Sequence, residues 1–272
     1  MNDSDRLTFA QIDGQPATVA DLAPLAFAGF AHFTAMQVRR GRVRGLDLHL
    51  ARLRAASLAL FDADIPDDQV RSQLRSAVAV AGSDALSLTA TVFTRSGEFN
   101  PRSQENDLSL LIRTSPASNG PECPLRLAVV QHERVLPSFK HTGETAKTYY
   151  LRDAGKHGFD DAIFLDRHGC LSEATIWNVA YWDGSAVVWP IADVLTGVTM
   201  GILQRQLKKL GVPQREVAVT PDMVGGFSGA VVMNSWTPGV SINAIAGTAI
   251  PAAPQFVELL HTAYLREPEV EI

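Results

Sequence analysis

Along this chain, the spacing of the hydrophobic residues alternates between every second residue, as in a strand, and every third or fourth residue, as in a helix. This alternation is the feature that most restricts the fold, because it predicts strands and helices that follow one another. The stretch "FAHFTAMQV" (30–38) is rich in β-forming residues and is followed by "RRG", which predicts a strand and a turn. Residues 46–61 place leucines at three- and four-residue steps, which predicts a helix. The pattern continues with a helix over 67–82 and strands over 85–95 and 107–113. The N-terminal part is therefore expected to form an α/β layer.

The alternation resumes after "TSPASNGPECP" (114–124), a segment rich in proline and small polar residues. It predicts strands over 125–130, 161–166, 229–236 and 239–247, a hairpin with an Asp-Gly turn over 178–190, and helices over 146–158, 199–211 and 254–267. We therefore expect a two-domain protein of the α+β or α/β class. Its expected parts are a small N-terminal α/β domain (1–115), an interdomain linker (116–122) and a larger, strand-rich C-terminal domain (123–272).

Composition and charge exclude several classes of protein. The formal net charge is −5 over 272 residues, so no basic stripe is available to neutralise the phosphates of a nucleic acid. Cys123 and Cys170 are far apart and form no CxxC motif, which favours neither a metal site nor a disulfide framework. The N-terminal residues do not resemble a signal peptide, and no uncharged stretch is long enough to span a bilayer. A soluble, cytoplasmic protein without a nucleic-acid or membrane partner is expected.

A single glutamate interrupts the apolar stretch "GCLSEATIWNVAYWDG" (169–184). A carboxylate buried between two strand-like runs must have a partner, since an unpaired buried charge is costly. Glu173 could be hydrogen-bonded for structural reasons, or it could pair with a cationic ring nitrogen. Asn178, five residues later, could orient a bound group or satisfy a turn.

Two further segments could hold an anion. In "LTGVTMGILQRQL" (195–207) a glycine-containing loop leads into a helix, with Thr199 near the helix start. Free N–H groups at such a start bind anions, although a threonine there can simply cap the helix. Arg52 lies on the predicted helix 46–61 beside its apolar face. Its guanidinium could reach solvent, or it could bind a phosphate or carboxylate.

Lys140 occurs in "LPSFKHTGETAK" (136–147), at the end of an apolar stretch and outside any predicted helix. Together with the carboxylate, the arginine and the helix start, it completes the set of groups that binds pyridoxal phosphate. A lysine amine forms a Schiff base with this cofactor, a carboxylate keeps the pyridine nitrogen protonated, and a helix start with an arginine binds the phosphate. The sequence therefore predicts pyridoxal 5′-phosphate as cofactor.

The order of these motifs resembles that of the class IV aminotransferases. These are the fold-type IV pyridoxal-phosphate enzymes, which include branched-chain and D-amino-acid aminotransferases and aminodeoxychorismate lyase. The likeness extends over about residues 25–267 and rests on "FTAMQVRRGRVRGLDLHLARL", "SFKHTGE", "LSEATIWNVAYWDG", "LTGVTMGIL" and "VVMNSWTPGVSI". The resemblance implies a two-domain fold like that of D-amino-acid aminotransferase, with the cofactor between the domains of a homodimer.

The resemblance also implies a role for individual residues. Lys140 would be the Schiff-base lysine and the acid/base that moves a proton between substrate Cα and cofactor C4′, with Lys147 as the alternative. Glu173 would pair with the pyridine nitrogen, and Asn178 is also implied in cofactor binding. The remaining residues implied in cofactor binding surround the phosphate: Arg52, Gly197, Val198, Thr199, Ser235 and Trp236.

The chain departs from the family pattern at several positions. Met200 stands where the family usually has an arginine, and Thr145 stands where branched-chain enzymes have a tyrosine. The family's arginine-rich pattern for the substrate carboxylate is not evident. Thr34 and Arg95 are the candidates for contact with substrate, and Arg95 could equally be a solvated strand end.

The leading expectation is an aminotransferase that moves an amino group between an amino acid and a 2-oxo acid. The alternative is a lyase of the same family that releases pyruvate. The motifs "FTAMQV" and "FKH" favour this alternative. A third possibility, outside enzymology, is a relative that binds a ligand without turnover.

Overall fold

The computed structural model describes residues 8–27, 29–96 and 108–272. The chain divides into two compact units. Unit 1 contains the residues up to Ser118 and two later segments, Phe139–Gly143 and Glu269–Ile272. Unit 2 contains Asn119–Ser138 and Glu144–Pro268. The chain therefore enters unit 2 close to the expected linker 116–122, but it returns to unit 1 twice.

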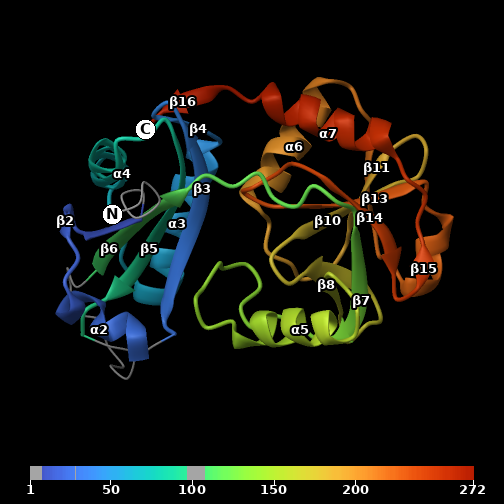
Figure 1. The fold of residues 1–272 in the computed structure, drawn as a ribbon, viewed down its shortest axis with the longest axis horizontal. Coiled ribbons are helices and arrows are strands. Elements are labelled where there is room, and N and C mark those ends of the chain that lie inside the picture. Colours follow the sequence, from blue (N-terminus) through green and yellow to red (C-terminus); the bar gives the residue numbers. More distant parts are fainter. Residues whose placement is uncertain (1–7, 28, 97–107) are drawn as a thin grey trace. The chain divides into compact units, whose positions relative to one another are not determined.

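The sheet of unit 1 is antiparallel, with the strand order β16-β4-β3-β5-β6-β1-β2 (Figure 1). Its strands are β1 (Phe9–Ile12), β2 (Gln15–Pro16), β3 (Ala31–Arg39), β4 (Arg42–Arg44), β5 (Ala85–Thr94), β6 (Leu108–Pro116) and β16 (Glu269–Glu271). The last strand comes from the C-terminal end of the chain and pairs with β4. Ion pairs from Arg42 to Glu271 and from Arg44 to Glu269 hold this pairing.

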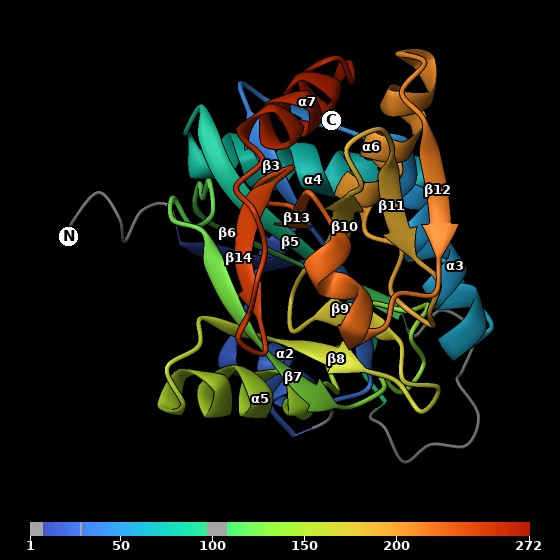
Figure 2. The same cartoon turned by 90° about the vertical axis from the view of Figure 1, so that its right-hand side faces the viewer.

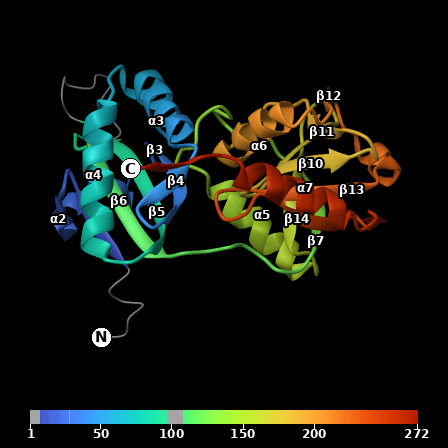
Figure 3. The same ribbon diagram turned by 90° about the horizontal axis from the view of Figure 1, so that it is seen from above.

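Three helices cover the sheet of unit 1: α2 (Val19–Phe27), α3 (Leu46–Phe61) and α4 (Asp67–Ala81). Leu50 and Leu53 of α3 share a core with Met36 of the sheet, and α4 contributes Leu74 to the same core. Figure 3 shows α4 running alongside the sheet, where it contacts β6. The turn into α3 depends on Gly45, whose φ of 67° lies in the left-handed region that favours glycine.

The sheet of unit 2 is mixed, with the strand order β12-β11-β10-β13-β14-β7-β8-β9 and β15 paired to β14. Its strands are β7 (Leu125–Gln131), β8 (Asp161–Leu165), β9 (Leu171–Ala174), β10 (Asn178–Trp182), β11 (Val187–Pro190), β12 (Gln214–Val217), β13 (Gly229–Met233), β14 (Val240–Ile245) and β15 (Thr248–Ala249). Leu127 and Ile163 from one part of the sheet share a core with Val179 and Val232 from the other. The sheet therefore curls around this core (Figure 2).

The helices of unit 2 are α5 (Thr145–Lys156), α6 (Val198–Lys209), a 3-10 helix η1 (Pro221–Gly226) and α7 (Pro254–Leu265). Helices α6 and α7 contact each other, and they share a core with residues of β10, β11 and β13. Helix α5 packs on β7 and β8. None of the described helices is both long and apolar enough to cross a membrane.

The structure differs from the sequence expectations mainly where strands pair with segments that are far away in the sequence. The helix predicted over 46–61 is observed with these limits. Strand β6 continues to Pro116, so the expected boundary at 115 falls inside a strand rather than after it. Strand β16 and the pairing of 139–143 with unit 1 were not predicted, because neither segment carries a strand pattern of its own.

Candidate functional site

Glu173 lies in β9 of unit 2, and its side chain is buried. Its Oε1 accepts hydrogen bonds from Nη1 of Arg134 at 3.3 Å and from the backbone N–H of Leu195 at 3.4 Å. Burial raises the pKa of the Glu173 carboxyl, while the positive charges of Arg134 and Lys147 act in the opposite direction. The apolar pattern around Glu173 therefore correctly predicted a buried carboxylate with a partner.

Arg134 links Glu173 to two residues at the start of α5. Its Nε donates to Oε1 of Glu144 at 2.9 Å, and Nζ of Lys147 lies 3.8 Å from Oε2 of the same carboxylate. The four side chains are 1% (Arg134), 8% (Glu144), 14% (Lys147) and 6% (Glu173) exposed. We call these four residues the Arg134 cluster. Burial lowers the pKa of Lys147, with a further contribution from the charge of Arg134.

Asn178 holds the loop that precedes α6. Its Nδ2 donates to the carbonyl of Leu195 at 2.7 Å, and its Oδ1 accepts from the N–H of Gly197 at 3.1 Å. A Cβ atom at position 197 would lie 2.1 Å from Oδ1 of Asn178, so no larger residue fits there without displacing the amide. Leu195 also donates to Glu173. Asn178 and Glu173 therefore position the same loop.

Helix α6 starts at Val198, directly after this loop. The N–H groups of the first turn of an α-helix have no acceptor within the helix, and together with the helix dipole they favour an anion. The side chain of Thr199 is buried, and its hydroxyl donates to the carbonyl of Asn234 at 2.8 Å. This bond ties the helix start to the turn that follows β13.

That turn contains Ser235 and Trp236. The N–H of Trp236 donates to Oδ1 of Asn234 at 2.8 Å, and the indole is 39% exposed. The ring lies edge-on to Trp177, with 5.6 Å between centroids. Within unit 2, hydrogen bonds thus link Glu173 and Asn178 to the loop before α6, and Thr199 to the turn that contains Ser235 and Trp236.

Lys140 belongs to the segment Phe139–Gly143, which the structure groups with unit 1 rather than with the C-terminal domain. The N–H of Phe33 in β3 donates to the carbonyl of Lys140 at 2.8 Å, and the N–H of Thr142 donates to the carbonyl of Ala31 at 2.8 Å. Nζ of Lys140 lies 5.0 Å from the centroid of the Phe33 ring, within the range of a cation–π contact. Backbone pairing with β3 thus fixes the position of this lysine.

Arg52 and Thr34 also lie in unit 1. Thr34 is fully buried, and its hydroxyl forms a 2.6 Å hydrogen bond with Nδ1 of His49 on α3. Arg52 lies one helical turn after His49. Burial lowers the pKa of His49 to about 3, and the positive charge of Arg52 makes a second, smaller contribution to this shift. The hydroxyl of Thr34 thus joins β3 to α3 in the interior of the unit, and the assignment of this residue to the substrate stays a prediction.

Arg95 was the other candidate for contact with substrate, and it lies just after the last residue of β5. Its guanidinium pairs with Asp13 at 3.1 Å and with Asp21 at 3.0 Å, and its Nε donates to Ser109 at 2.8 Å. These partners stabilise the end of the sheet where β5 meets the N-terminal segment. The assignment of Arg95 to the substrate stays a prediction.

The sequence analysis did not identify Arg134 and Glu144 as site residues. A usable signal was present, because "HERVLPSFKHTGETAK" places three cations and two carboxylates in a proline- and glycine-containing segment without helical periodicity. Only the structure shows that Arg134 and Glu144 turn inward toward Glu173, whereas Glu133 pairs with exposed Arg167.

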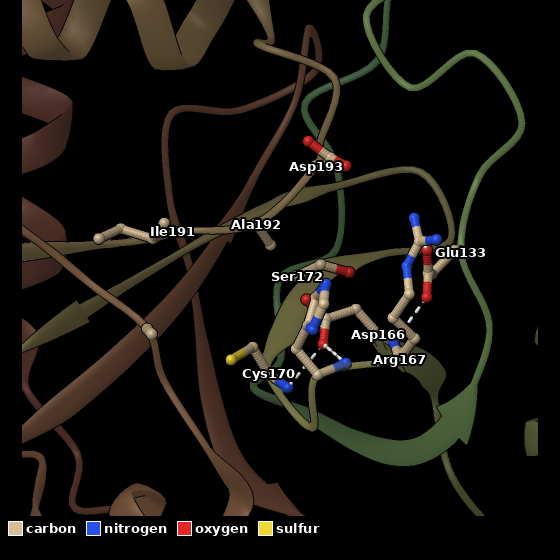
Figure 4. Close-up of a pocket in the computed structure, with 10 residues that line it drawn as sticks. Glu133, Asp166, Arg167, Cys170, Ser172, Ile191, Ala192 and Asp193 are labelled. Atoms are coloured by element: carbon tan, nitrogen blue, oxygen red, sulfur yellow. Dashed lines mark hydrogen bonds and ion pairs between the residues drawn. The ribbon is translucent and has the colours of Figure 1, made fainter.

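A separate pocket of about 380 Å³ lies on unit 2 beside the turn between β8 and β9 (Figure 4). Ser172 lines it, so Glu173, the next residue of the strand, projects to the opposite face. Glu133 and Arg167 form an ion pair of 2.9 Å in this pocket, and Asp166 accepts from the backbone N–H of Cys170. No residue assigned to the cofactor lines it. Among the described residues, no group of histidine, cysteine and acidic side chains is arranged to hold a metal ion.

Comparison with known proteins places the chain in a family. The family model described as amino-transferase class IV matches residues 31–245. A probable branched-chain-amino-acid aminotransferase of Rickettsia felis is 30% identical over 82 residues, which are 30% of this chain and 28% of that protein. A protein of the same name from Rickettsia bellii is 23% identical over 153 residues, which are 54% of this chain and 52% of that protein. The matches thus span about half or less of the length of these curated relatives.

Solved structures share the fold over nearly the whole chain. The branched-chain aminotransferase of the archaeon Thermoproteus uzoniensis has a TM-score of 0.83 at 20% identity, covering 95% of this chain and 94% of that one. The Escherichia coli branched-chain amino acid aminotransferase has a TM-score of 0.83 at 15% identity, with coverage of 95% and 93%. A putative 4-amino-4-deoxychorismate lyase from Legionella pneumophila has a TM-score of 0.77 at 18% identity, with coverage of 90% and 94%. The expected α+β fold of fold type IV is confirmed.

Proposed function

Because the chain belongs to the class IV aminotransferase family, we propose that it is a pyridoxal-phosphate-dependent aminotransferase. It would transfer an amino group between an amino acid and a 2-oxo acid. The observation that carries the proposal is the buried carboxylate of Glu173, held by Arg134 and by the loop that leads directly into the start of α6. One unit thus offers a carboxylate for a ring nitrogen and a helix start for a phosphate.

The chemistry of unit 2 fits the cofactor at its ring nitrogen. When bound, pyridoxal phosphate acts as an electron sink for the carbanion that forms at substrate Cα. Glu173 would accept a hydrogen bond from the protonated ring nitrogen and so keep it cationic. Asn178 would keep Leu195 and Gly197 in place, because it bonds to the backbone of both.

The phosphate would bind at the start of α6. The backbone N–H groups of Val198 and Thr199 are the donors, and Gly197 allows a close approach because it lacks a side chain. Ser235 and Trp236 would complete this pocket, since the Thr199–Asn234 bond ties their turn to the helix start. Arg52 would add a planar cation suited to two phosphate oxygens.

We assign the covalent bond with the cofactor to Lys140. Its amine would also hold the proton removed from substrate Cα and return it to the cofactor at C4′. The assignment rests on the position of Lys140 in the family motif "SFKHTGE". Lys147 is the competing candidate, because it lies in the same buried cluster as Glu173.

Branched-chain amino acids are the first amino donors to test, since the curated relatives and several structures of the same fold carry this name. The protein loaded with pyridoxal phosphate should be mixed with single L- or D-amino acids without an acceptor. We expect branched-chain L-amino acids to shift the visible absorbance to that of pyridoxamine phosphate. If no amino acid of either hand produces this shift, the aminotransferase assignment is wrong.

The lyase remains the second candidate because of the Lys140–His141 pair and the shared fold of the Legionella protein. A lyase acting on aminodeoxychorismate releases pyruvate and leaves the cofactor as the aldehyde. Pyruvate measured with a coupled dehydrogenase therefore distinguishes the two activities. Stoichiometric pyruvate without pyridoxamine phosphate would favour the lyase.

A further inference from the structure

Lys147 is a buried cation for which the proposed reaction has no use. It lies in the first turns of α5, and its side chain is 14% exposed. Its Nζ is 3.8 Å from Glu144, whose other oxygen accepts from Arg134, and Arg134 in turn donates to Glu173. Lys147 is thus connected to Glu173 through two other charged side chains of the Arg134 cluster.

The four residues of this cluster carry two positive and two negative formal charges. Arg134 divides its donors between two carboxylates, with the shorter contact (2.9 Å) to Glu144 and the longer one (3.3 Å) to Glu173. If the charge of Lys147 were removed, these four groups would carry a net negative charge in a place with little water. Two carboxylates that share such a site compete for one proton, and the proton binds to the carboxylate that has the weaker contact with Arg134. That carboxylate is Glu173.

We propose that Lys147 is a positioning residue that keeps Glu173 ionised through Glu144 and Arg134, so that Glu173 can receive a cationic ring nitrogen. This inference rests on the proposed role of Glu173. A neutral carboxylic acid at this position would donate to an unprotonated ring nitrogen instead of accepting from a protonated one. Lys147 would therefore set the charge state of the bound cofactor without touching its reacting atoms.

Other titratable groups near Glu173 leave this conclusion unchanged. Asp161 on the neighbouring strand β8 accepts from Thr175 at 2.7 Å and from Nε1 of Trp177 at 2.9 Å, so both of its oxygens have donors outside the cluster. His132 packs between Tyr150 and Phe164, and burial lowers its pKa, which favours the neutral ring. Among these groups, the positive charge of Lys147 therefore decides whether Glu173 is ionised or protonated.

Two measurements test the proposal with Lys147→Met. The infrared C=O stretch of a protonated carboxyl, recorded at neutral pH on the full chain without cofactor, should appear in Lys147→Met. It should be absent from the wild type and from Lys147→Met/Glu173→Gln. In a second measurement, the affinity for pyridoxal phosphate, followed by tryptophan fluorescence, should fall about tenfold or more near pH 6, since one pKa unit corresponds to a factor of ten. The loss should shrink as the pH rises through the raised pKa of Glu173.

Three further variants separate this role from a structural one. Lys147→Arg keeps the charge and should keep the affinity. Lys147→Met/Glu144→Gln removes one charge of each sign, so it should lose the infrared band and recover most of the affinity. Lys156→Met, at an exposed position of the same helix, is the control and should behave as the wild type.

The proposal is overturned if Lys147→Met shows no protonated carboxyl, or if the double variant binds no better than Lys147→Met. If no variant and not even the wild type binds pyridoxal phosphate, the proposed function fails. The infrared result then still decides the role of Lys147.

Discussion

Nη1 of Arg134 donates to Oε1 of Glu173 across 3.3 Å, and the two side chains are 1% and 6% exposed. A carboxylate buried to this extent is ionised only when a cation or several donors face it. The same arginine also holds Glu144, the residue that precedes α5. Arg134 therefore joins β9, which carries Glu173, to the start of α5.

Replacing Arg134 with methionine should destabilise the protein by about 3–5 kcal/mol, because the partner carboxylates lose their buried cation. Urea unfolding at neutral pH measures this loss. Arg126→Met is the matched control, since Arg126 pairs with Asp160 at 3.5 Å on the surface and its side chain is 54% exposed. A loss for Arg134→Met no larger than that of the control would contradict the role given to the buried pair.

Gly197→Ala should weaken the binding of pyridoxal phosphate and of inorganic phosphate. The added Cβ would lie 2.1 Å from Oδ1 of Asn178, so the amide and the loop before α6 must move. Because the backbone donors of the helix start move with the loop, we expect a loss of about tenfold or more, comparable to one charge-assisted hydrogen bond. Isothermal titration with either ligand measures the change.

Gly155→Ala provides the control for this prediction. Position 155 lies in α5, where an added Cβ atom would meet only open space, and alanine favours a helix. The affinity of this variant for phosphate should equal that of the wild type. If Gly197→Ala also keeps the wild-type affinity, the phosphate does not bind at the start of α6.

Arg52→Met should reduce the retention of the cofactor by about ten- to a hundredfold, the scale of one lost charge-assisted hydrogen bond. Equilibrium dialysis of the loaded protein measures this retention. Arg54→Met, two residues later on the same helix, removes an exposed arginine that pairs with Asp67 and should leave retention unchanged. Equal retention in the two variants would remove Arg52 from the phosphate site.

Unit 1 should lose stability in acid because of its buried histidines. Burial lowers the pKa of His32 to about 4 and that of His49 to about 3. Their folded-state pKa values lie below the unfolded value of about 6.5, so the unfolded chain binds more protons between these limits. Stability is therefore present above pH 6.5 and falls as the pH drops below it.

For His32 alone the loss between pH 7 and pH 5 should be about 2 kcal/mol. Urea unfolding of His32→Asn should show a smaller difference between these two pH values than the wild type. His157→Asn, at an exposed position directly after α5, should keep the full difference. A wild-type protein with equal stability at both values would show that these histidines are accessible to protons.

Local sequence patterns predicted the secondary structure of the central elements well. Helix α3 coincides with the apolar spacing of its leucines, and the hairpin of β10 and β11 turns at Asp183, whose carboxylate accepts from the N–H groups of Ser185 and Ala186. Strand β16 could not be predicted in this way. It pairs with β4, which is more than 200 residues away, and its three residues include two glutamates.

The candidate site was predictable where a residue type is unusual for its surroundings. Glu173 stood out because it interrupts an apolar stretch, and Gly197 because it precedes a helix. The gathering of charges in residues 132–147 marked the segment of Arg134, but not the residue itself, since an arginine in a polar segment is usually solvated. For Arg95, the sequence indicated only a position at a strand end, and its ion pairs with Asp13 and Asp21 could not be foreseen. Such pairings depend on distant segments that a local pattern does not reveal.

The covalent bond to the lysine can be located by reducing the protein loaded with pyridoxal phosphate with borohydride and mapping the tryptic peptides. A pyridoxyl group on Lys140 blocks cleavage there and gives a modified peptide of residues 135–147, whereas a group on Lys147 gives a modified peptide of residues 141–152. We predict the first peptide in the wild type and its absence from Lys140→Ala. Modification at Lys147, or at neither lysine, would contradict the assignment.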